Sequence, residues 1–347
     1  MKAVIYKKFK GPIDITTVND PVPGKDDTVI KVMASGICRS DWHGWMGNDP
    51  DIRHLPHVPG HEFAGIVTEC GKNVKKWKSG ERITTPFVCA CGTCPECQRG
   101  NQHICDFQTQ PGFTHWGSFA EYVLVKNADI NLVSLPDEID FITAASLGCR
   151  FVTAYRAIRD QGKVKAGSWV AIHGCGGVGL AAIMIAHALD ARVIGVDINP
   201  EALKIAQSIG ADYVLDANDI KNIPETIREI SDRGADVSLD ALGSKITCIN
   251  SILSLKKRGR HIQVGLLAGD DYRPQLPMEK VIANELEILG SHGMQAWKYK
   301  EMLDLILNKK LVPQKLISKT ISLNAVPDQF DHMSSFKDSG LIIVDLF

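Results

Sequence analysis

The sequence predicts an α/β protein in which a β-rich first half precedes a doubly wound parallel sheet. Before residue 150, short strand patterns alternate with Gly and Pro turns, whereas strands and helices alternate after it. In addition, a glycine-rich loop joins one strand of the second half to the following helix. A length of 347 residues suits two or three domains. We expect a first domain over 1–150, a second over 151–291, and a C-terminal segment over 292–347 that returns to the first.

The composition is that of an ordinary soluble enzyme, with 44% hydrophobic residues, 23% charged residues and a net charge of −1. Such a balance argues against nucleic acid or an acidic membrane surface as a partner. The longest apolar run, 180–189, is too short to span a bilayer. The first residues alternate like a strand and lack the apolar region of a secretion signal. We therefore expect a cytoplasmic protein.

In the first half, the strand pattern over 29–34 leads into a segment with the ligand types of a catalytic zinc. Cys38, His61 and Glu62 offer a thiolate, an imidazole and a carboxylate, which zinc binds when one position stays open for water or substrate. A lone Cys–His pair is more often a buried thiol and a surface histidine, but two further motifs favour a metal here. Asp41 could orient the His61 ring, or it could be an ordinary turn residue.

The first of these motifs is a dense cysteine cluster with the spacing Cys-x2-Cys-x2-Cys-x7-Cys. Four thiolates so close in sequence can complete a tetrahedral zinc shell, which makes a structural site. Iron–sulfur ligation would suit the same spacing, but an adjoining second site favours zinc. Ten cysteines in a cytoplasmic chain indicate metal ligands or catalysis rather than disulfides. The predicted ligands are Cys91, Cys94, Cys97 and Cys105.

The second motif is the glycine-rich loop, which lies between a buried strand over 168–173 and an apolar helix over 180–189. It matches the dinucleotide-binding pattern G-x-G-x-x-G, in which the glycines allow a tight turn, close approach of pyrophosphate and close helix packing. Asp197 ends the next strand and would bind the ribose hydroxyls and repel a 2′-phosphate, so we expect NAD rather than NADP. The loop residues are Gly174, Gly176, Gly177, Val178 and Gly179.

Further alternation supports a parallel sheet. Strands are expected over 192–196, 235–240, 259–264 and 285–290, with helices over 246–255 and 297–307. Repeated strand–helix units of this kind imply right-handed crossovers.

At this point the motifs resemble a known family. Cys-Arg-Ser-Asp-x-His at 38–43 and Gly-His-Glu at 60–62 are similar to the zinc-dependent alcohol dehydrogenases of the medium-chain dehydrogenase/reductase superfamily. The resemblance implies a GroES-like catalytic domain that carries both zinc sites, a Rossmann domain, and a homodimer or homotetramer. It also implies that Cys149 is the third protein ligand of the catalytic zinc beside Cys38 and His61. Whether Glu62 or Cys149 binds at a given moment stays open.

The same resemblance assigns further roles. Ser40 and His43 would relay the proton of the substrate, and Arg39, Thr153, Val178 and Val264 would contact the cofactor. In three places the chain departs from the family pattern: Leu341 follows Gly340 where a basic residue is common, Ala202 replaces a common basic residue, and Arg150 replaces a small one. Nothing in the sequence explains Arg150.

The sequence therefore predicts an enzyme that transfers hydride between a primary or secondary alcohol and NAD, with zinc as Lewis acid. Trp42, Trp45 and Trp116 would narrow an apolar substrate pocket, or they could be core residues. A polyol or amino-alcohol dehydrogenase of the same superfamily is the closest alternative, because zinc ligands do not determine the substrate. A non-catalytic zinc- or nucleotide-binding protein is another. A zinc-free quinone reductase is disfavoured, since it would not need Cys38, His61 and Glu62 together.

Overall fold

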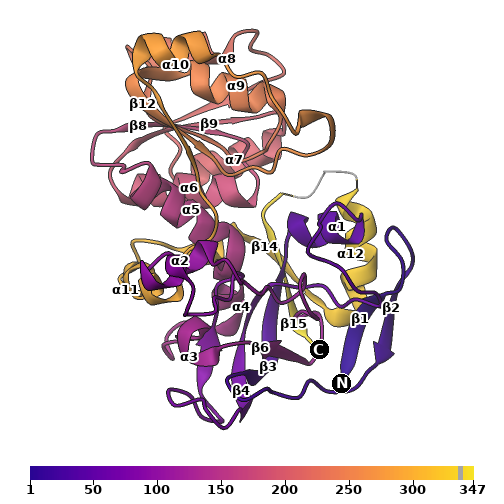
Figure 1. Cartoon of the computed structure of the whole chain (residues 1–347). Helices are drawn as coiled ribbons and strands as arrows, with labels where there is room; N and C mark the ends of the chain where they lie inside the picture. The colour runs from indigo at the N-terminus through magenta and orange to yellow at the C-terminus, as the bar shows by residue number, and fades with distance from the viewer. Residues whose placement is uncertain (335–338) are drawn as a thin grey trace. The chain divides into compact units, whose positions relative to one another are not determined.

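A computed structural model describes residues 1–334 and 339–347, and these residues form two compact units. The first unit contains Met1–Val152, Gly293–Leu307 and Ile317–Phe347. The second contains Thr153–His292 and Asn308–Leu316, the latter inside the segment that was expected to return to the first domain. Figure 1 shows the elements of both units.

The first unit is built around a mainly antiparallel sheet in which β3 (Thr28–Ile37) and β4 (Glu62–Cys70) are central. β15 (Leu341–Leu346) pairs with β3, so the end of the chain completes the sheet of its first half. A separate hairpin joins β1 (Lys2–Tyr6) and β2 (Ile13–Thr17). The other strands are β5 (Arg82–Thr84), β6 (Tyr122–Val125), β7 (Val133–Ser134) and β14 (Ile317–Ser322). Among the described strands of this sheet, only β14 and β15 pair parallel.

Short helices flank this sheet, and two apolar clusters hold the unit together. Ile30, Phe63 and Ile83 pack in one cluster, and Phe119 and Phe330 pack in the other. Burial of such side chains drives the packing of the helices onto the sheet. The helices are α1 (Arg39–Trp45), α2 (Pro95–Gln98), α3 (Ala128–Asn131), α4 (Phe141–Ala145), α11 (Tyr299–Leu307) and α12 (Val326–Met333).

The second unit is a six-stranded parallel sheet with the order β10-β9-β8-β11-β12-β13, the doubly wound order of dinucleotide-binding folds. Helices α8 (Ile223–Ile230), α9 (Lys245–Leu253) and α10 (Met278–Asn284) lie on one face of the sheet (Figure 1). Helices α6 (Gly177–Ala188) and α7 (Pro200–Ser208) lie on the other face (Figure 1). The strands are β8 (Trp169–His173), β9 (Arg192–Asp197), β10 (Tyr213–Asp216), β11 (Ala235–Asp240), β12 (Leu255–Gln263) and β13 (Glu287–Gly290).

Every strand that the sequence predicted for this unit is present, but β10 was not predicted, and some boundaries differ. β12 begins at Leu255, four residues before the predicted start, because Leu255 pairs with Ala235 across an irregular register that the basic run after it conceals. α6 is buried on nearly all sides, as its apolar sequence predicted. The helices of this unit are α5 (Val152–Arg156), α6 (Gly177–Ala188), α7 (Pro200–Ser208), α8 (Ile223–Ile230), α9 (Lys245–Leu253) and α10 (Met278–Asn284).

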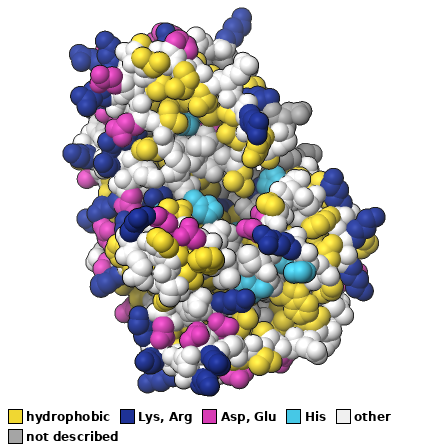
Figure 2. Space-filling view, in the orientation of Figure 1, with side chains coloured by type: hydrophobic (Ala, Val, Ile, Leu, Met, Phe, Trp, Pro, Cys, Tyr) yellow, Lys and Arg dark blue, Asp and Glu magenta, His cyan; other side chains and the backbone are white. Residues whose placement is uncertain are grey.

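The surface has no single charge character on the face drawn in Figure 2, where basic and acidic side chains are interspersed. This distribution agrees with the net charge of −1 and lacks the basic stripe typical of nucleic-acid-binding proteins. Over residues 1–334 and 339–347, the helices are too short or too polar for any of them to cross a membrane.

Candidate metal and nucleotide sites

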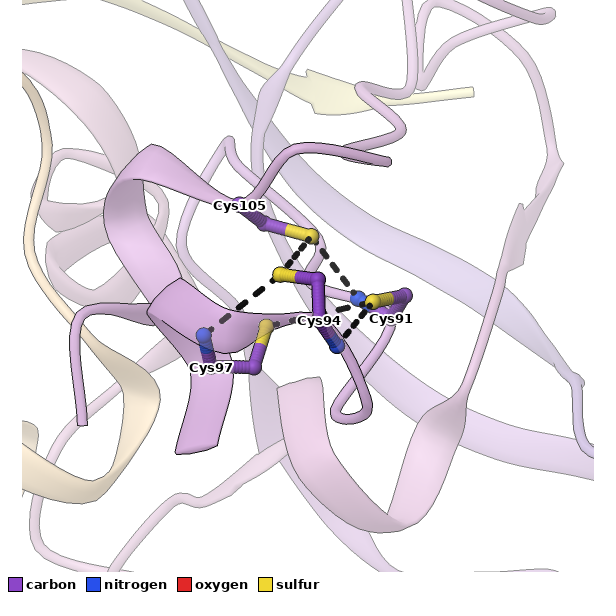
Figure 3. A group of neighbouring side chains, drawn as sticks. All are labelled: Cys91, Cys94, Cys97 and Cys105. Atoms are coloured by element: carbon purple, nitrogen blue, oxygen red, sulfur yellow. Dashed lines mark hydrogen bonds between the residues drawn. The ribbon is translucent and has the colours of Figure 1, made fainter. Parts of the chain in front are cut away.

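The four clustered cysteines converge as the spacing predicted, with their sulfur atoms directed toward one another (Figure 3). Two sulfur pairs, Cys91–Cys97 and Cys94–Cys105, are 3.9 and 3.8 Å apart. A tetrahedron of sulfurs at the usual zinc–sulfur distance of about 2.3 Å has edges of about 3.8 Å. These two pairs match the edges of a tetrahedral zinc site, all four sulfurs lie within 4.8 Å of one another, and four thiolates leave no position open.

Local backbone structure prepares one of these sulfurs, that of Cys91, to be a thiolate, whereas burial raises the pKa of Cys97 and Cys105. Cys94 is the N-cap of α2, and its sulfur accepts the Cys97 N–H. Burial opposes ionisation of Cys91, but hydrogen bonds from the Thr93 hydroxyl and from the Thr93 and Cys94 N–H groups outweigh it and lower the pKa of Cys91 to about 6. The chain thus offers a metal-ready anion before any metal binds.

A second group of ligand atoms is formed by residues far apart in sequence: Cys38, His61, Glu62 and Cys149. Their ligand atoms all lie within 4.8 Å of one another. The pairing of β3 with β4 sets Gly36 opposite Glu62, which brings Cys38 and His61 to the same end of the sheet. Cys149 comes from a π-helical turn, Leu147–Phe151 (η2), which closes on them. Such turns are common at functional sites.

Asp41 organises this group. Its Oδ1 accepts hydrogen bonds from His61 Nδ1 at 2.8 Å and from Gly60 N at 3.0 Å, and its Oδ2 accepts from Cys38 N at 2.9 Å. The carboxylate thereby holds the proton of His61 on Nδ1, as the sequence predicted for a residue that orients this ring.

His61 Nε2 is consequently the nitrogen left for a metal. Burial opposes protonation of the ring, but Asp41 and Cys38 raise the pKa of His61 well above its usual value, so a metal would displace a proton there. This nitrogen is buried, and no described residue makes a hydrogen bond with it. A buried polar atom left unpaired is costly, and a metal ion would satisfy it. A hydrogen bond from Cys149 lowers the pKa of Cys38 well below its usual value in spite of burial, so the thiolate that zinc requires is already favoured. The residues therefore fit a zinc ion.

Glu62 lies beside these ligands but is engaged elsewhere. Its Oε1 accepts hydrogen bonds from Arg150 N at 3.1 Å and Arg150 Nε at 2.9 Å, and its Oε2 accepts from Arg150 Nη2. Both side chains are buried. The sequence left open whether Glu62 or Cys149 would bind metal, and it missed the partner of Glu62. The only sequence signal for this ion pair was Arg150 itself, an unexpected residue directly after the predicted ligand Cys149.

The two predicted relay residues lie on α1, directly after Cys38. Ser40 and His43 are three residues apart in one helix and so share a face. Both are half-buried, and His43 Nδ1 is 3.4 Å from the Asn48 side-chain amide. Burial, and next the positive charge of Arg39, lower the pKa of His43 below its usual value. Arg39 itself stacks on Trp42 and donates to the carbonyl of Met333.

Two of the three tryptophans lie in the core, whereas Trp116 lines a pocket of the first unit together with His57 and Phe113. Trp42 and Trp45 belong to an apolar core cluster of the first unit with Phe330. Their indole N–H groups donate to Ser334 Oγ and Gly11 O. They are core residues, the alternative that the sequence allowed. Trp116 is half-buried against another small cluster, around Ile5.

In the second unit, the glycine-rich loop has the geometry that its sequence predicted. Gly174 follows β8 with a φ of +94°, a conformation that favours glycine. A Cβ on Gly179 would lie 1.8 Å from Gly174 O, so the helix can pack this closely only with glycine there. At Gly176, by contrast, a Cβ would meet nothing within 4 Å. This open side next to the N-terminus of α6 suits a pyrophosphate.

Polar side chains at the carboxyl ends of neighbouring strands complete this edge of the sheet. Asp197 ends β9, where its Oδ2 accepts Cys175 N at 2.6 Å and its Oδ1 accepts Ile198 N and Asn199 N. It therefore shapes the loop as well as offering an acceptor to a ribose. Sequence reasoning missed Asp240, which is buried at the end of β11 and accepts Leu242 N, Gly243 N and Gln263 Nε2.

The remaining predicted cofactor residues also belong to this unit. Val264 directly follows β12, and its N–H donates to Asp240 O. Thr153 is buried in α5, and its carbonyl accepts from Ser291 Oγ. Val178 is half-buried in the first turn of α6. The carboxyl edge of a doubly wound sheet is where ligands bind in such folds.

Comparison with known proteins gives matches along the whole chain. Residues 24–137 match the family model "Alcohol dehydrogenase GroES-like domain", and residues 177–308 match "Zinc-binding dehydrogenase". An alcohol dehydrogenase of Geobacillus stearothermophilus is 32% identical over 100% of this chain and 99% of its own length. An NAD-dependent alcohol dehydrogenase of Sulfurisphaera tokodaii is 31% identical over 98% of each chain. These matches confirm the predicted fold class and the resemblance that the motifs indicated.

Solved structures agree with these relatives. The alcohol dehydrogenase of Thermus sp. ATN1 superposes with a TM-score of 0.90 at 28% identity, and the match covers 100% of both chains.

The two metal groups should respond differently to loss of one thiolate. We expect Cys94→Ser to lower the melting temperature by more than about 4 °C, because a closed structural site contributes folding free energy. Cys38→Ser should leave the melting temperature nearly unchanged and abolish turnover. Elemental analysis of the wild type should find two zinc ions per chain. One metal per chain, or equal destabilisation by the two variants, would contradict the assignment.

Asp41→Asn should weaken metal binding without unfolding the chain. The amide cannot accept from three donors, so the ring of His61 loses its fixed orientation, and loss of such a partner costs about 10- to 100-fold in metal affinity. A chelator titration that follows metal release measures this loss. Asp212→Asn is the matched control, since Asp212 also accepts a backbone N–H group, from Val193, but lies exposed in the second unit, which contributes no metal ligand. Equal effects of the two substitutions would argue against the role of Asp41.

Proposed function

Because the chain belongs to the zinc-binding alcohol dehydrogenases of the medium-chain dehydrogenase/reductase superfamily, and is therefore an oxidoreductase, we propose that it transfers hydride between a primary or secondary alcohol and NAD. Cys38, His61 and Cys149 hold the catalytic zinc in this proposal, and Cys91, Cys94, Cys97 and Cys105 hold the structural one. The observation that carries it is the buried, unpaired Nε2 of His61, which faces two cysteine sulfurs.

The zinc, when bound, supplies a Lewis acid that lowers the pKa of an alcohol at the open position. The chain supplies the path of the proton. Ser40 Oγ accepts the hydroxyl proton, since a hydroxyl can accept and donate at once. The imidazole of His43 then receives it and passes it to water. Both residues stand on the first helix after a proposed ligand, Cys38, so the metal site and the relay share one anchor.

The second unit supplies the cofactor site. The backbone N–H groups of the loop at 174–179 bind the pyrophosphate, assisted by Arg39, and Asp197 accepts the ribose hydroxyls. Thr153, Val178 and Val264 contact the nicotinamide ring. The 1–150 domain thus carries the metals and the 151–291 domain carries NAD. In the part of the chain that the structure describes, all ten cysteines are free thiols, which suits the reducing cytoplasm that we propose as the location.

The decisive experiment is an assay of the purified chain with NAD and a panel of primary and secondary alcohols, polyols and amino alcohols. We expect formation of reduced nicotinamide with simple alcohols, and loss of this activity after treatment with a zinc chelator. A preference for polyols or amino alcohols would identify the alternative enzyme class. Binding of zinc and NAD without any turnover would identify a sensor rather than an enzyme.

The cofactor preference should be for NAD and should be reversible by two substitutions. Asp197→Ala removes the charge that repels a 2′-phosphate, and Ile198→Arg adds a cation at an exposed neighbour while it keeps the Asn199 cap of α7. A charged hydrogen bond is worth about 1.5–3 kcal/mol, or about 10- to 100-fold in kcat/KM. The ratio of kcat/KM for the two cofactors measures the shift. A wild-type enzyme that already prefers NADP would refute this proposal.

The proton relay should appear in the pH dependence of alcohol oxidation. Ser40→Ala should remove about 100-fold or more of the rate. Because the pKa of His43 is lowered, its imidazole stays neutral and able to accept a proton throughout the neutral pH range. His43→Gln should therefore slow oxidation at neutral pH, with recovery in alkaline buffer or with an added base. His54→Gln, at an exposed histidine, is the control. If the pH–rate profile of His43→Gln overlays the wild type, His43 is not in the relay.

A second copy of the chain is the proposed partner, as a homodimer or homotetramer. Within the described residues, β13 is an edge strand that pairs with β12 alone, and its Ile288 is exposed. The neighbouring α10 has no buried side chain among those described, and Ile282 is 76% exposed. An open apolar edge of this kind invites strand pairing. We expect Ile288→Lys to shift the mass measured by light scattering toward the monomer. An unchanged mass would locate the interface elsewhere.

A further inference from the structure

We propose that Arg150 is a positioning residue that holds Glu62 outside the coordination sphere of the catalytic metal and so keeps one position open for substrate. This inference rests on the proposed function, in which Cys38, His61 and Cys149 bind zinc. It assigns a role to the one residue near the metal group that the sequence could not explain.

The first argument is the number of hydrogen bonds that Glu62 accepts from one residue. The backbone N–H, Nε and Nη2 of Arg150 all donate to its two carboxylate oxygens. A guanidinium that meets a carboxylate with two parallel bonds fixes its orientation as well as its charge. A carboxylate held in this way has to give up these bonds before it can bind a metal.

The second argument is the arrangement of the two chain segments that carry these residues. His61 and Glu62 are adjacent, and so are Cys149 and Arg150. His61 and Cys149, the first member of each pair, turn to the metal group. Glu62 and Arg150, the second members, bind each other. The π-helical turn Leu147–Phe151 therefore supplies both the metal thiolate and the group that restrains Glu62.

The third argument is the narrow space around the carboxylate. A Cβ on Gly36, opposite Glu62 in the sheet, would lie 2.5 Å from Glu62 Oε2. A Cβ on Gly148 would lie 3.1 Å from Glu62 Cα. Two glycines thus let the backbone close on Glu62 from two sides. The carboxylate has little room to point elsewhere, so its choice is between Arg150 and the metal group.

The fourth argument is charge. Two thiolates neutralise a Zn²⁺ ion, and Arg150 neutralises Glu62. Without Arg150, a carboxylate with no exposure to solvent would lack its counter-ion, and an unpaired buried charge is strongly destabilising. The carboxylate oxygen lies within 4.8 Å of the other ligand atoms, and zinc accepts carboxylate oxygen. Glu62 would then occupy the position meant for substrate.

The test uses the full chain loaded with Co²⁺, whose visible spectrum reports the ligands, and imidazole as a probe of the open position. In wild type, imidazole should shift the spectrum. In Arg150→Met, the spectrum without imidazole should differ from that of wild type, and the dissociation constant of imidazole should rise by about 10- to 100-fold. In the double variant Glu62→Gln/Arg150→Met, both should return close to wild type, because no carboxylate is left to compete.

Two further variants make the result interpretable. Arg260→Met removes an arginine that pairs with Glu287 in the second unit, which contributes no metal ligand, and should leave the spectrum and the imidazole affinity unchanged. Arg150→Lys keeps the positive charge but cannot form the two parallel hydrogen bonds of a guanidinium. It should raise the imidazole dissociation constant by less than Arg150→Met does. If Arg150→Met does not fold, Arg150→Lys and the double variant decide, since replacing both members of a buried ion pair is often nearly neutral for stability.

A folded Arg150→Met chain with the wild-type spectrum and imidazole affinity would overturn the inference, since Arg150 would then be only structural. A double variant that stays altered would also overturn it, because the effect would not act through Glu62. Failure of the proposed function looks different: wild-type chain loaded with Co²⁺ would show no response to imidazole at all.

Discussion

The catalytic part of this chain depends on one buried carboxylate. Asp41 accepts hydrogen bonds from Cys38 N, Gly60 N and His61 Nδ1, and so it joins the end of β3 to the start of β4. These are the two segments that carry the first two proposed ligands. The backbone bonds place the ligands, and the bond to the imidazole decides which nitrogen is free. A carboxylate has enough lone pairs for all three donors, whereas an amide or hydroxyl does not.

Residues next to Asp41 and Cys38 in the sequence have different functions, metal binding and proton transfer. Cys38 directly follows β3, and Ser40 and His43 follow it on the first helix, so one short segment serves both metal and proton. Asp197 has a comparable double role in the second unit, because it shapes the glycine loop and presents an acceptor at the same edge of the sheet. In both units, functional groups stand where strands end, which is where loops are free to approach a ligand while the sheet holds them rigidly.

The features that the sequence predicted are those encoded locally. The cysteine spacing, the glycine loop between strand and helix, and Asp197 at the next strand end all appear within short stretches, and the structure has the strands and helices in the predicted order. The pairing of Arg150 with Glu62 joins residues 88 positions apart, and no local pattern reports it. Asp240 escaped notice for another reason: its role is to accept loop N–H groups, and an aspartate at a strand end has many possible uses.

The contrast between local and distant ligands also bears on how the two metals enter during synthesis. All four cysteines of the structural group lie between residues 91 and 105, so only short loops have to close around that ion, and closure of short loops costs little entropy. The other group needs Cys38 and Cys149 to meet, which requires β3, β4 and the turn after α4 to be in place. On a ribosome, the segment 91–105, here called the lobe, can therefore capture its zinc while the chain is still emerging, whereas the catalytic ion has to wait for the completed sheet. Under zinc scarcity, newly made chains would accumulate with the lobe filled and the catalytic position vacant, as a folded reserve that a later supply of zinc activates.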